Sequence, residues 1–217
     1  MEIKWYGQSC FEIISEKATV VIDPYSEEIG LKLPPLTADI VLVSHQHHDH
    51  NNVEAVAGKS GGAPKVISNP GEYEVLGVYI HGVQSFHDAA GGKDRGVNTI
   101  FVIDIDGVRI CHLGDLGGDL SNEDLEAIGE VDVLLVPVGG VFTIDAKKAL
   151  MVANQIEPKI VVPMHYKIPG LNINLVDLEN FNEQFDAVEG EAEYLKVAKS
   201  DMTKEEREVV VLKPQGQ

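Results

Sequence analysis

The sequence predicts an α/β protein in which β-strands come first and strand–helix units appear in both halves of the chain. The chain opens with short β-branched and aromatic runs and contains longer apolar runs of the kind that form buried strands. Helical patterns follow several of these runs. With 217 residues, 44% of them hydrophobic, and no linker or repeat, we expect a single domain over residues 1–217.

The first half of the chain is predicted to be mostly β-structure. Short apolar runs predict an antiparallel start to a sheet, and a continuous apolar run at 39–44 is typical of a strand buried on both faces. A short helix is expected at 51–57, capped by Asn51 or Asn52. The predicted strands lie at 2–6, 10–14, 18–23, 39–44, 65–68, 72–80, 83–87, 99–105 and 108–113, and Asp106-Gly107 signals a hairpin between the last two.

The second half alternates helices and strands. Ser121 and the acidic residues after it predict the start of a helix, and residues 145–156 place apolar side chains on one helical face. The predicted helices lie at 121–129, 145–156 and 176–185, and the predicted strands at 131–137, 159–163, 193–198 and 208–213.

Polar or glycine-rich loops directly follow three of the buried runs, at residues 44–50, 137–143 and 163–170. In open sheets, sites collect beyond the carboxyl ends of strands, where loops from separate strands converge. We therefore expect side chains of these loops to meet. Gly139 and Gly140 in the second loop either allow close backbone approach or form a tight turn.

The first of these loops, SHQHHDH, holds four of the chain's eight histidines. His45 and His47 are two residues apart in an extended segment, so both imidazoles can point the same way, while Asp49 and His50 can face a second point nearby. This spacing predicts two metal positions, and the ligand types suit zinc, manganese or iron. His48 is out of phase and is interpreted as a bystander or as a group behind the ligands.

Three isolated histidines are further candidates for metal binding. His87 ends a predicted strand and opens a glycine-rich loop, His165 ends another strand, and His112 lies three residues before Asp115. A lone histidine is more often a surface or core residue, so these assignments depend on the motif context.

The pattern His45-x-His47-x-Asp49-His50 resembles the signature of the metallo-β-lactamase superfamily. The order continues with His87 as the later single histidine, Asp115 as the bridging aspartate, His165 as the last histidine and Asp23 as the early aspartate that supports the site. Residues 114–116 and 137–143 resemble the compact branch of metal-dependent hydrolases related to ascorbate-6-phosphate lactonase. The resemblance implies a four-layer αββα sandwich of two mixed sheets.

The same resemblance implies a dinuclear metal centre. One ion is assigned to His45, His47 and His87, the other to Asp49, His50 and His165, with Asp115 between them; zinc is favoured, and manganese or iron are alternatives. Asp23 and His112 are expected behind these ligands, although His112 can equally pack in a strand. A hydroxide held between the ions would attack the substrate, and Asp49 would orient it and take its proton.

We therefore expect a metal-dependent hydrolase that acts on a small ester, lactone or phosphodiester. The alternatives are a nuclease of the same superfamily acting on RNA or nucleotides, and a non-enzymatic metal-binding protein. The chain carries 35 acidic against 17 basic residues, a net charge of −18, which disfavours a nucleic-acid partner.

Cations near two predicted ligands suggest an anionic substrate. Arg95 and Lys93 lie in the loop after His87, and Lys167 lies two residues beyond His165; ordinary solvated charges are the alternative. The N-terminal sequence shows no export signal and no apolar run long enough to cross a bilayer, so we expect a cytoplasmic protein without membrane contact. A homo-oligomer is left open.

Overall fold

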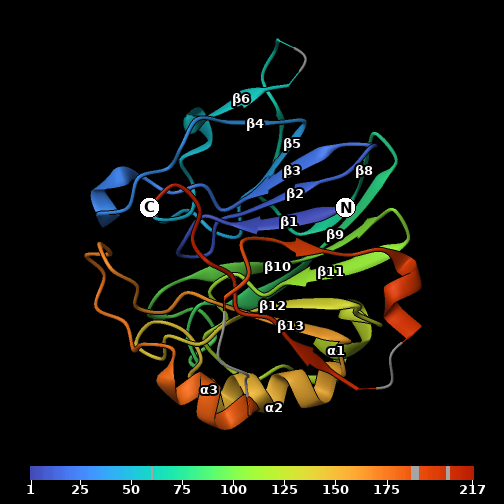
Figure 1. Cartoon of the computed structure of the whole chain (residues 1–217). Coiled ribbons are helices and arrows are strands. Elements are labelled where there is room, and N and C mark those ends of the chain that lie inside the picture. The colour runs from blue at the N-terminus through green and yellow to red at the C-terminus, as the bar shows by residue number, and fades with distance from the viewer. Residues whose placement is uncertain (60, 187–190, 204–205) are drawn as a thin grey trace.

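The computed structural model describes residues 1–59, 61–186, 191–203 and 206–217. Two large mixed sheets pack face to face, and a two-stranded ribbon lies beyond the first (Figure 1). The six-stranded sheet has the order β14 (Leu195–Lys196), β1 (Glu2–Trp5), β2 (Phe11–Ile14), β3 (Thr19–Ile22), β5 (Ile40–Leu42) and β7 (Lys65–Ile67). The seven-stranded sheet has the order β15 (Glu208–Val209), β13 (Ile160–Met164), β12 (Val133–Pro137), β11 (Val108–His112), β10 (Val97–Ile105), β9 (Val78–Phe86) and β8 (Gly71–Val75). The ribbon pairs β4 (Leu36–Ala38) with β6 (Val56–Gly58).

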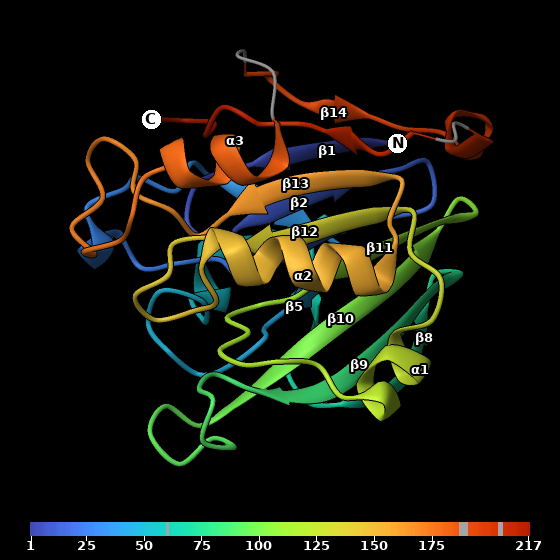
Figure 2. The same cartoon turned by 90° about the horizontal axis from the view of Figure 1, so that it is seen from below.

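The helices of the described residues are short, and the α-helices belong to the second half of the chain. They are α1 (Asn122–Ile128), α2 (Ala146–Ile156) and α3 (Glu179–Phe185), with the 3-10 turns η1 (Glu27–Ile29), η2 (Val53–Ala55) and η3 (Lys199–Thr203). Figure 2 shows α2 lying along β12 on the outer side of the seven-stranded sheet. None of the described helices has the length and apolar character needed to cross a membrane.

The sequence fixes the start of two helices through side-chain caps. Asp145 accepts a hydrogen bond from the Lys148 amide at 2.8 Å and so begins α2. Ser121 and Asp124 form a reciprocal capping box at α1. The buried face of α2 includes Ala149 and Val152, which places small apolar side chains toward the sheet.

Each sheet combines an antiparallel and a parallel part. Strands β1, β2 and β3 pair antiparallel, whereas β3, β5 and β7 pair parallel. In the other sheet β8 to β11 pair antiparallel and β11, β12 and β13 pair parallel. Because parallel neighbours end at the same edge of a sheet, the loops after them are brought together.

The hydrophobic core lies between the sheets and draws on both. Trp5 and Phe11 of the first sheet and Phe101 of the second are fully buried. Every residue of β12 and β13 is buried, since the core covers one face of these strands and helices cover the other. Burial of each large apolar side chain stabilises the fold by roughly 1.5–3 kcal/mol.

The predicted α/β class and the face-to-face sheets are confirmed, while two local predictions are wrong. Residues 72–80 form a hairpin rather than one strand, because Leu76 and Gly77 both adopt positive φ and turn the chain between β8 and β9. The helix expected at 51–57 is the single turn η2 followed by β6, since the chain pairs with β4 and the Asn52 side chain makes no cap. Among the described residues, the layer outside the six-stranded sheet therefore consists of the β4–β6 ribbon and 3-10 turns.

Candidate metal centre

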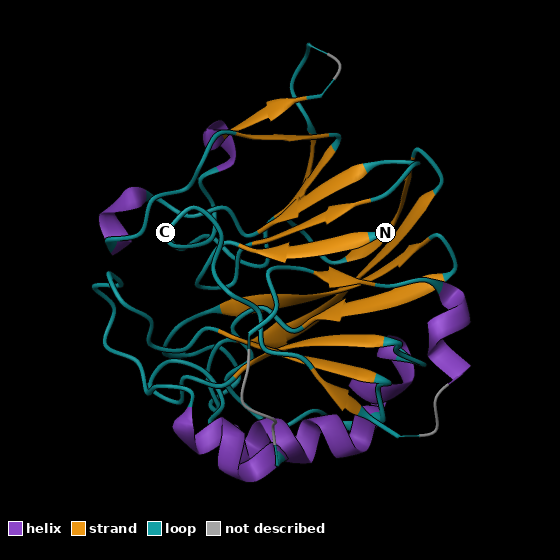
Figure 3. Cartoon of the chain, viewed as in Figure 1, coloured by secondary structure: helices purple, strands orange, loops and turns teal. Residues whose placement is uncertain are grey.

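Polar side chains from four strand ends meet at one edge of the sandwich. They come from the loop after β5, the end of β9, the loop after β11 and the end of β13. Figure 3 shows the long loops gathered at this edge, on the left of the view. The loops that were predicted to converge therefore do lie together in the structure.

All seven predicted ligands lie in two adjoining groups. His45, His47 and His87 form one group, in which the candidate ligand atoms lie within 4.8 Å of one another. The second group meets the same limit and consists of Asp49, His50, Asp115 and His165. The resemblance implied the same seven residues, with Asp115 between the two groups rather than in the second. No other group of this kind occurs among the described residues.

The Asp115 carboxylate is central to both groups. Its Oδ2 atom lies 3.2 Å from Nε2 of His87, 3.1 Å from that of His165, 3.3 Å from that of His50 and 4.0 Å from that of His45. Burial disfavours the charged carboxylate, but the neighbouring His165 and His50 imidazoles outweigh it and hold the pKa of Asp115 well below its usual range. One oxygen atom thus faces ligands of both groups, as a bridging carboxylate would.

The unpaired ring nitrogens of this cluster fit metal binding. The Nε2 atoms of His45 and His50 are buried and make no hydrogen bond, although the Asp115 carboxylate lies 3.3 Å from Nε2 of His50. Leaving a buried polar atom unpaired costs about 1–3 kcal/mol, so native structures rarely leave several together. Burial also lowers the pKa of His45 to about 3, which keeps this imidazole neutral and able to bind a cation. Divalent ions accept nitrogen and carboxylate donors of this kind.

Asp23 and Ser44 orient two of the imidazoles from behind. The Asp23 carboxylate accepts hydrogen bonds from the Ser44 amide at 2.7 Å and from the Ser44 hydroxyl at 2.6 Å, and it lies 2.9 Å from Nδ1 of His50. The Ser44 Oγ lies 2.9 Å from Nδ1 of His45. Because both Nδ1 atoms have oxygen partners, the Nε2 atom of each ring is the one left to face the centre.

Three polar residues that the sequence analysis missed also support the centre. The side-chain amide of Gln8 donates to Oδ2 of Asp49 at 2.9 Å, and the main-chain carbonyl of Gln8 accepts from the His165 main-chain amide at 2.9 Å. Asn98 accepts from the Asp115 amide at 3.0 Å, and Ser9 donates to Oδ1 of Asp115 at 3.4 Å. The only sequence signal for this support is the polar segment at 7–9 between two apolar strands.

His112 supports the backbone and makes no contact with the centre that would mark it as a ligand. Its Nε2 lies 2.9 Å from the Ser9 carbonyl, and its Nδ1 accepts from the Gly114 amide at 3.1 Å. The ring is fully buried and meets Phe11 edge-on. The sequence left two roles open for His112, support of the site and packing in a strand. The ring does both, because it packs against Phe11 and also holds the backbone of the loop that carries Asp115.

Two glycines allow close backbone contacts behind the ligands. A Cβ atom on Gly117 would lie 2.3 Å from the backbone of His87, and one on Gly139 would lie 2.1 Å from the His165 carbonyl oxygen. Such distances are shorter than any real contact of a Cβ atom. For Gly139, this favours the close-approach interpretation of the glycine pair.

A pocket of about 400 Å³ opens over the centre. Its lining includes His47, Asp49, the exposed His48, the guanidinium-bearing Arg95 and the apolar Phe142. Lys167 does not line this pocket, because its ammonium group donates to the carbonyls of Leu171 and Ile173. Lys93 is exposed and also lies outside the lining.

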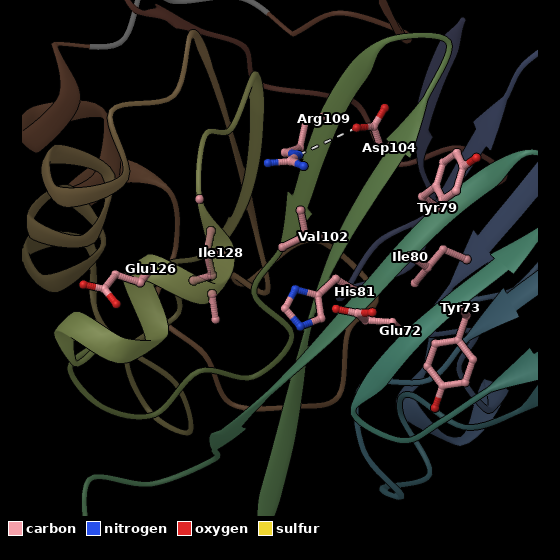
Figure 4. A pocket seen from close by; sticks show the side chains of 12 residues that line it. Glu72, Tyr73, Tyr79, Ile80, His81, Val102, Asp104, Arg109, Glu126 and Ile128 are labelled. Carbon is pink, nitrogen blue, oxygen red and sulfur yellow. Dashed lines mark ion pairs between the residues drawn. The ribbon is translucent and has the colours of Figure 1, made fainter.

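A second hollow, of about 430 Å³, lies between the strands β8 to β11 and helix α1. Figure 4 shows Glu72 close to His81, while Arg109 pairs with Asp104 at 3.8 Å. The described residues of this hollow bring no group of three potential metal ligands together. The chemistry is therefore assigned to the pocket over the histidines.

The sequence matches the model of the β-lactamase superfamily domain over residues 2–165. The chain belongs to this superfamily. The UPF0173 metal-dependent hydrolase of Thermococcus onnurineus is 32% identical over 190 residues, which cover 76% of this chain and 84% of the relative. The UPF0173 metal-dependent hydrolase of Methanoculleus marisnigri is 32% identical over 204 residues, covering 85% and 89%. Within the superfamily, this chain therefore belongs with the UPF0173 metal-dependent hydrolases.

Solved structures support the same placement. A protein of Thermotoga maritima, described as a candidate zinc-dependent hydrolase of the metallo-β-lactamase superfamily, is 41% identical, with a TM-score of 0.80 and 97% of each chain covered. The hydrolase Igni18 of Ignicoccus hospitalis shares the fold at 23% identity and a TM-score of 0.64. These findings confirm the predicted superfamily and its fold, while the tie to ascorbate-6-phosphate lactonase stays a prediction.

Proposed function

We propose that this member of the β-lactamase superfamily hydrolyses a small ester, lactone or phosphodiester with the help of two divalent metal ions. His45, His47 and His87 would hold one ion, Asp49, His50 and His165 the other, and Asp115 would contact both. The observation that carries this proposal is the position of the Asp115 Oδ2 atom, 3.1–4.0 Å from Nε2 of four histidines drawn from both groups. A site for a single ion would not need a carboxylate oxygen that lies between two separate groups of ligands.

Zinc is the metal that we propose first. The ligand set is made of imidazole nitrogens and carboxylate oxygens and contains no thiol, which suits zinc and also manganese or iron. When bound, such ions lower the pKa of a coordinated water to about 7 and polarise an oxygen of the substrate.

The residues of the chain would position the reaction around these ions. Asp49 is only partly buried and lines the pocket, so its carboxylate can orient the attacking water and accept its proton. Gln8 fixes the Oδ2 atom of this carboxylate by donating to it at 2.9 Å. The water oxygen forms a bond to the carbonyl carbon or phosphorus, the bond to the leaving oxygen breaks, and the proton passes from Asp49 to that oxygen.

The size and charge of the site favour a small-molecule substrate. A pocket of about 400 Å³ lies within the range of small-ligand sites, roughly 300–1,000 Å³. The net charge of −18 would repel a long polyphosphate chain. These two features favour a hydrolase of small substrates over a nuclease.

The proposal can be tested with protein stripped of metal and reloaded with zinc or manganese. A panel of a γ-lactone, a p-nitrophenyl ester and bis(p-nitrophenyl) phosphate should show metal-dependent turnover of at least one compound. Asp115→Ala should lower kcat by at least 100-fold, whereas Asp119→Ala removes an exposed carboxylate of the same loop that pairs with Lys148 and should retain activity. Full activity of Asp115→Ala, or no turnover of any compound by the loaded protein, would overturn the proposal.

A further inference from the structure

The loop that joins β9 to β10 folds around one carboxylate. Asp88 directly follows His87, is 7% exposed, and accepts four backbone hydrogen bonds. Its Oδ1 accepts from the amides of Ala90 and Gly92 at 2.8 and 2.9 Å. Its Oδ2 accepts from those of Asp94 and Arg95 at 3.0 and 2.8 Å. The carboxylate therefore fixes the path of the loop from its first residue to Arg95.

The loop is also closed at its base. The His87 amide donates to the Gly96 carbonyl at 3.1 Å, and the Gly96 amide donates to the Gly92 carbonyl at 3.1 Å. The backbone of Arg95 is thus tied to the backbone of His87, a predicted metal ligand. A loop held in this way places a side chain at a defined position relative to the centre.

The Arg95 side chain reaches over the pocket and is held there without a carboxylate partner. Its guanidinium lies 5.1 Å from the centroid of the Phe142 ring, and Nη1 lies 3.5 Å from the Phe142 carbonyl. No described carboxylate lies within 4.0 Å of it, whereas Arg109, Lys148, Lys199 and Lys213 each pair with one. The chain has about twice as many acidic as basic residues, so carboxylates are plentiful as partners. A guanidinium that lies at a pocket without one is therefore available to bind an anionic ligand.

Among the described residues that line this pocket, Arg95 is also the single Lys or Arg side chain. Lys167, the other cation expected near the site, donates to backbone carbonyls of its own loop. Phe142 and Ile173 add apolar surface to the lining. The pocket therefore offers three chemistries: the metal ligands, an apolar surface and one planar cation that can bind an oxyanion through two parallel hydrogen bonds.

We propose that Arg95 determines specificity by binding a carboxylate or phosphate group of the substrate, remote from the bond that is hydrolysed, and that Asp88 positions Arg95 for this task. The natural substrate is then a small ester or lactone with an anionic tail and a short apolar spacer. This inference rests on the proposed hydrolysis and adds the substrate class to it.

The test compares three p-nitrophenyl esters with the same leaving group: the monoester of glutaric acid, its methyl ester, and the analogue with a phosphonate in place of the free carboxylate. For the zinc-loaded wild-type protein, kcat/KM should be at least tenfold higher for at least one anionic ester than for the neutral one. Arg95→Gln should remove at least tenfold of this preference, mainly through KM. The anionic ester whose kcat/KM falls more in Arg95→Gln shows whether the site recognises a carboxylate or a phosphate group.

Lys93→Gln is the matched control, because it removes an exposed positive charge from the same loop outside the pocket lining. It should leave the ratio between anionic and neutral esters within about twofold of the wild-type ratio. An equal fall of kcat/KM for all three esters in Arg95→Gln, or the same loss of preference in Lys93→Gln, would overturn the role of Arg95.

Asp88→Asn tests the positioning role, since an amide can accept only at its oxygen and must leave part of the four N–H groups unpaired. Its anionic preference should fall as in Arg95→Gln, and adding Asp88→Asn to Arg95→Gln should cause no further loss. Metal content must stay at the wild-type level in this variant, because His87 is adjacent. Additive losses of preference would show that Asp88 does not act through Arg95.

Binding of succinate, glutarate and adipate, measured by calorimetry on zinc-loaded protein, separates this inference from the proposed hydrolysis. At least one dicarboxylate should bind tenfold tighter than butyrate, and Arg95→Gln should abolish that gain. Turnover without such a gain would overturn the anion site alone. A gain that depends on Arg95, together with no turnover of any ester, would overturn the hydrolysis and leave the anion site standing.

Discussion

At the scale of single residues, the centre combines side chains that a motif reveals with side chains that only tertiary contacts reveal. His45, His47, Asp49 and His50 are close in sequence, so their spacing alone predicted that they share a site. Asp115 and His165 were assigned through their order in the chain, and both lie in the cluster.

His87 was the ligand with the weakest sequence signal, and the structure places its Nε2 3.2 Å from Asp115. His87→Ala should lower the metal content of the first group, because two imidazoles would remain there. His48→Ala should leave both ions bound, since His48 is exposed and belongs to neither group. Metal analysis of both variants after gel filtration checks this, and the opposite result would mean that the motif was placed in the wrong register.

Gln8, Asn98 and Ser44 could not be predicted as supporting residues. Gln8 contacts Asp49 across 41 positions of the sequence, and Asn98 reaches Asp115 across 17. Amide and hydroxyl side chains are common in loops, so their role appears only when the fold brings them to a ligand. Lys167 illustrates the reverse case, because its closeness in sequence to His165 did not bring its ammonium into the pocket.

At the scale of elements, periodicity predicted the buried strands and the helices α1 to α3, because their patterns extend over several residues. The hairpin at Asp106-Gly107 was also predicted correctly, and both residues adopt positive φ. Failures occurred where a short pattern was ambiguous. Leu76-Gly77 turns the chain within an apolar run, and Val56 pairs with Leu36 where a helix had been expected.

The contact between the β11–α1 loop and the end of β9 gives a prediction at this scale. Gly117→Ala should destabilise the fold by about 1–3 kcal/mol and lower the metal content of the first group, because the new Cβ would overlap the His87 backbone. Gly118→Ala is the control, since its Cβ would meet Ala89 at an ordinary 3.5 Å. Thermal unfolding and metal analysis of the two variants should therefore differ, and equal effects would contradict this view of the loop.

At the scale of the whole molecule, two sheets place four separate strand ends around one buried cluster. The sequence predicted this convergence through the position of polar loops after apolar runs, whereas the relative placement of the sheets came from the family resemblance. Because buried imidazole nitrogens of this cluster make no hydrogen bond, we expect the folded chain to be less stable without metal.

Zinc should therefore raise the stability of the stripped protein. At a free concentration 100 times the dissociation constant, one bound ion adds about 2.7 kcal/mol to the free energy of unfolding. Chemical denaturation with and without metal measures this gain, which should be smaller in Asp115→Ala because the shared ligand is lost. Equal stability of the stripped and loaded wild-type protein would show that the cluster does not bind metal in the folded state.

The number of ions bound per chain tests the central claim most directly. Protein kept in excess zinc or manganese near neutral pH, then freed of unbound metal and assayed by mass spectrometry, should contain two ions per chain. Saturation at one ion would contradict a dinuclear centre built around Asp115.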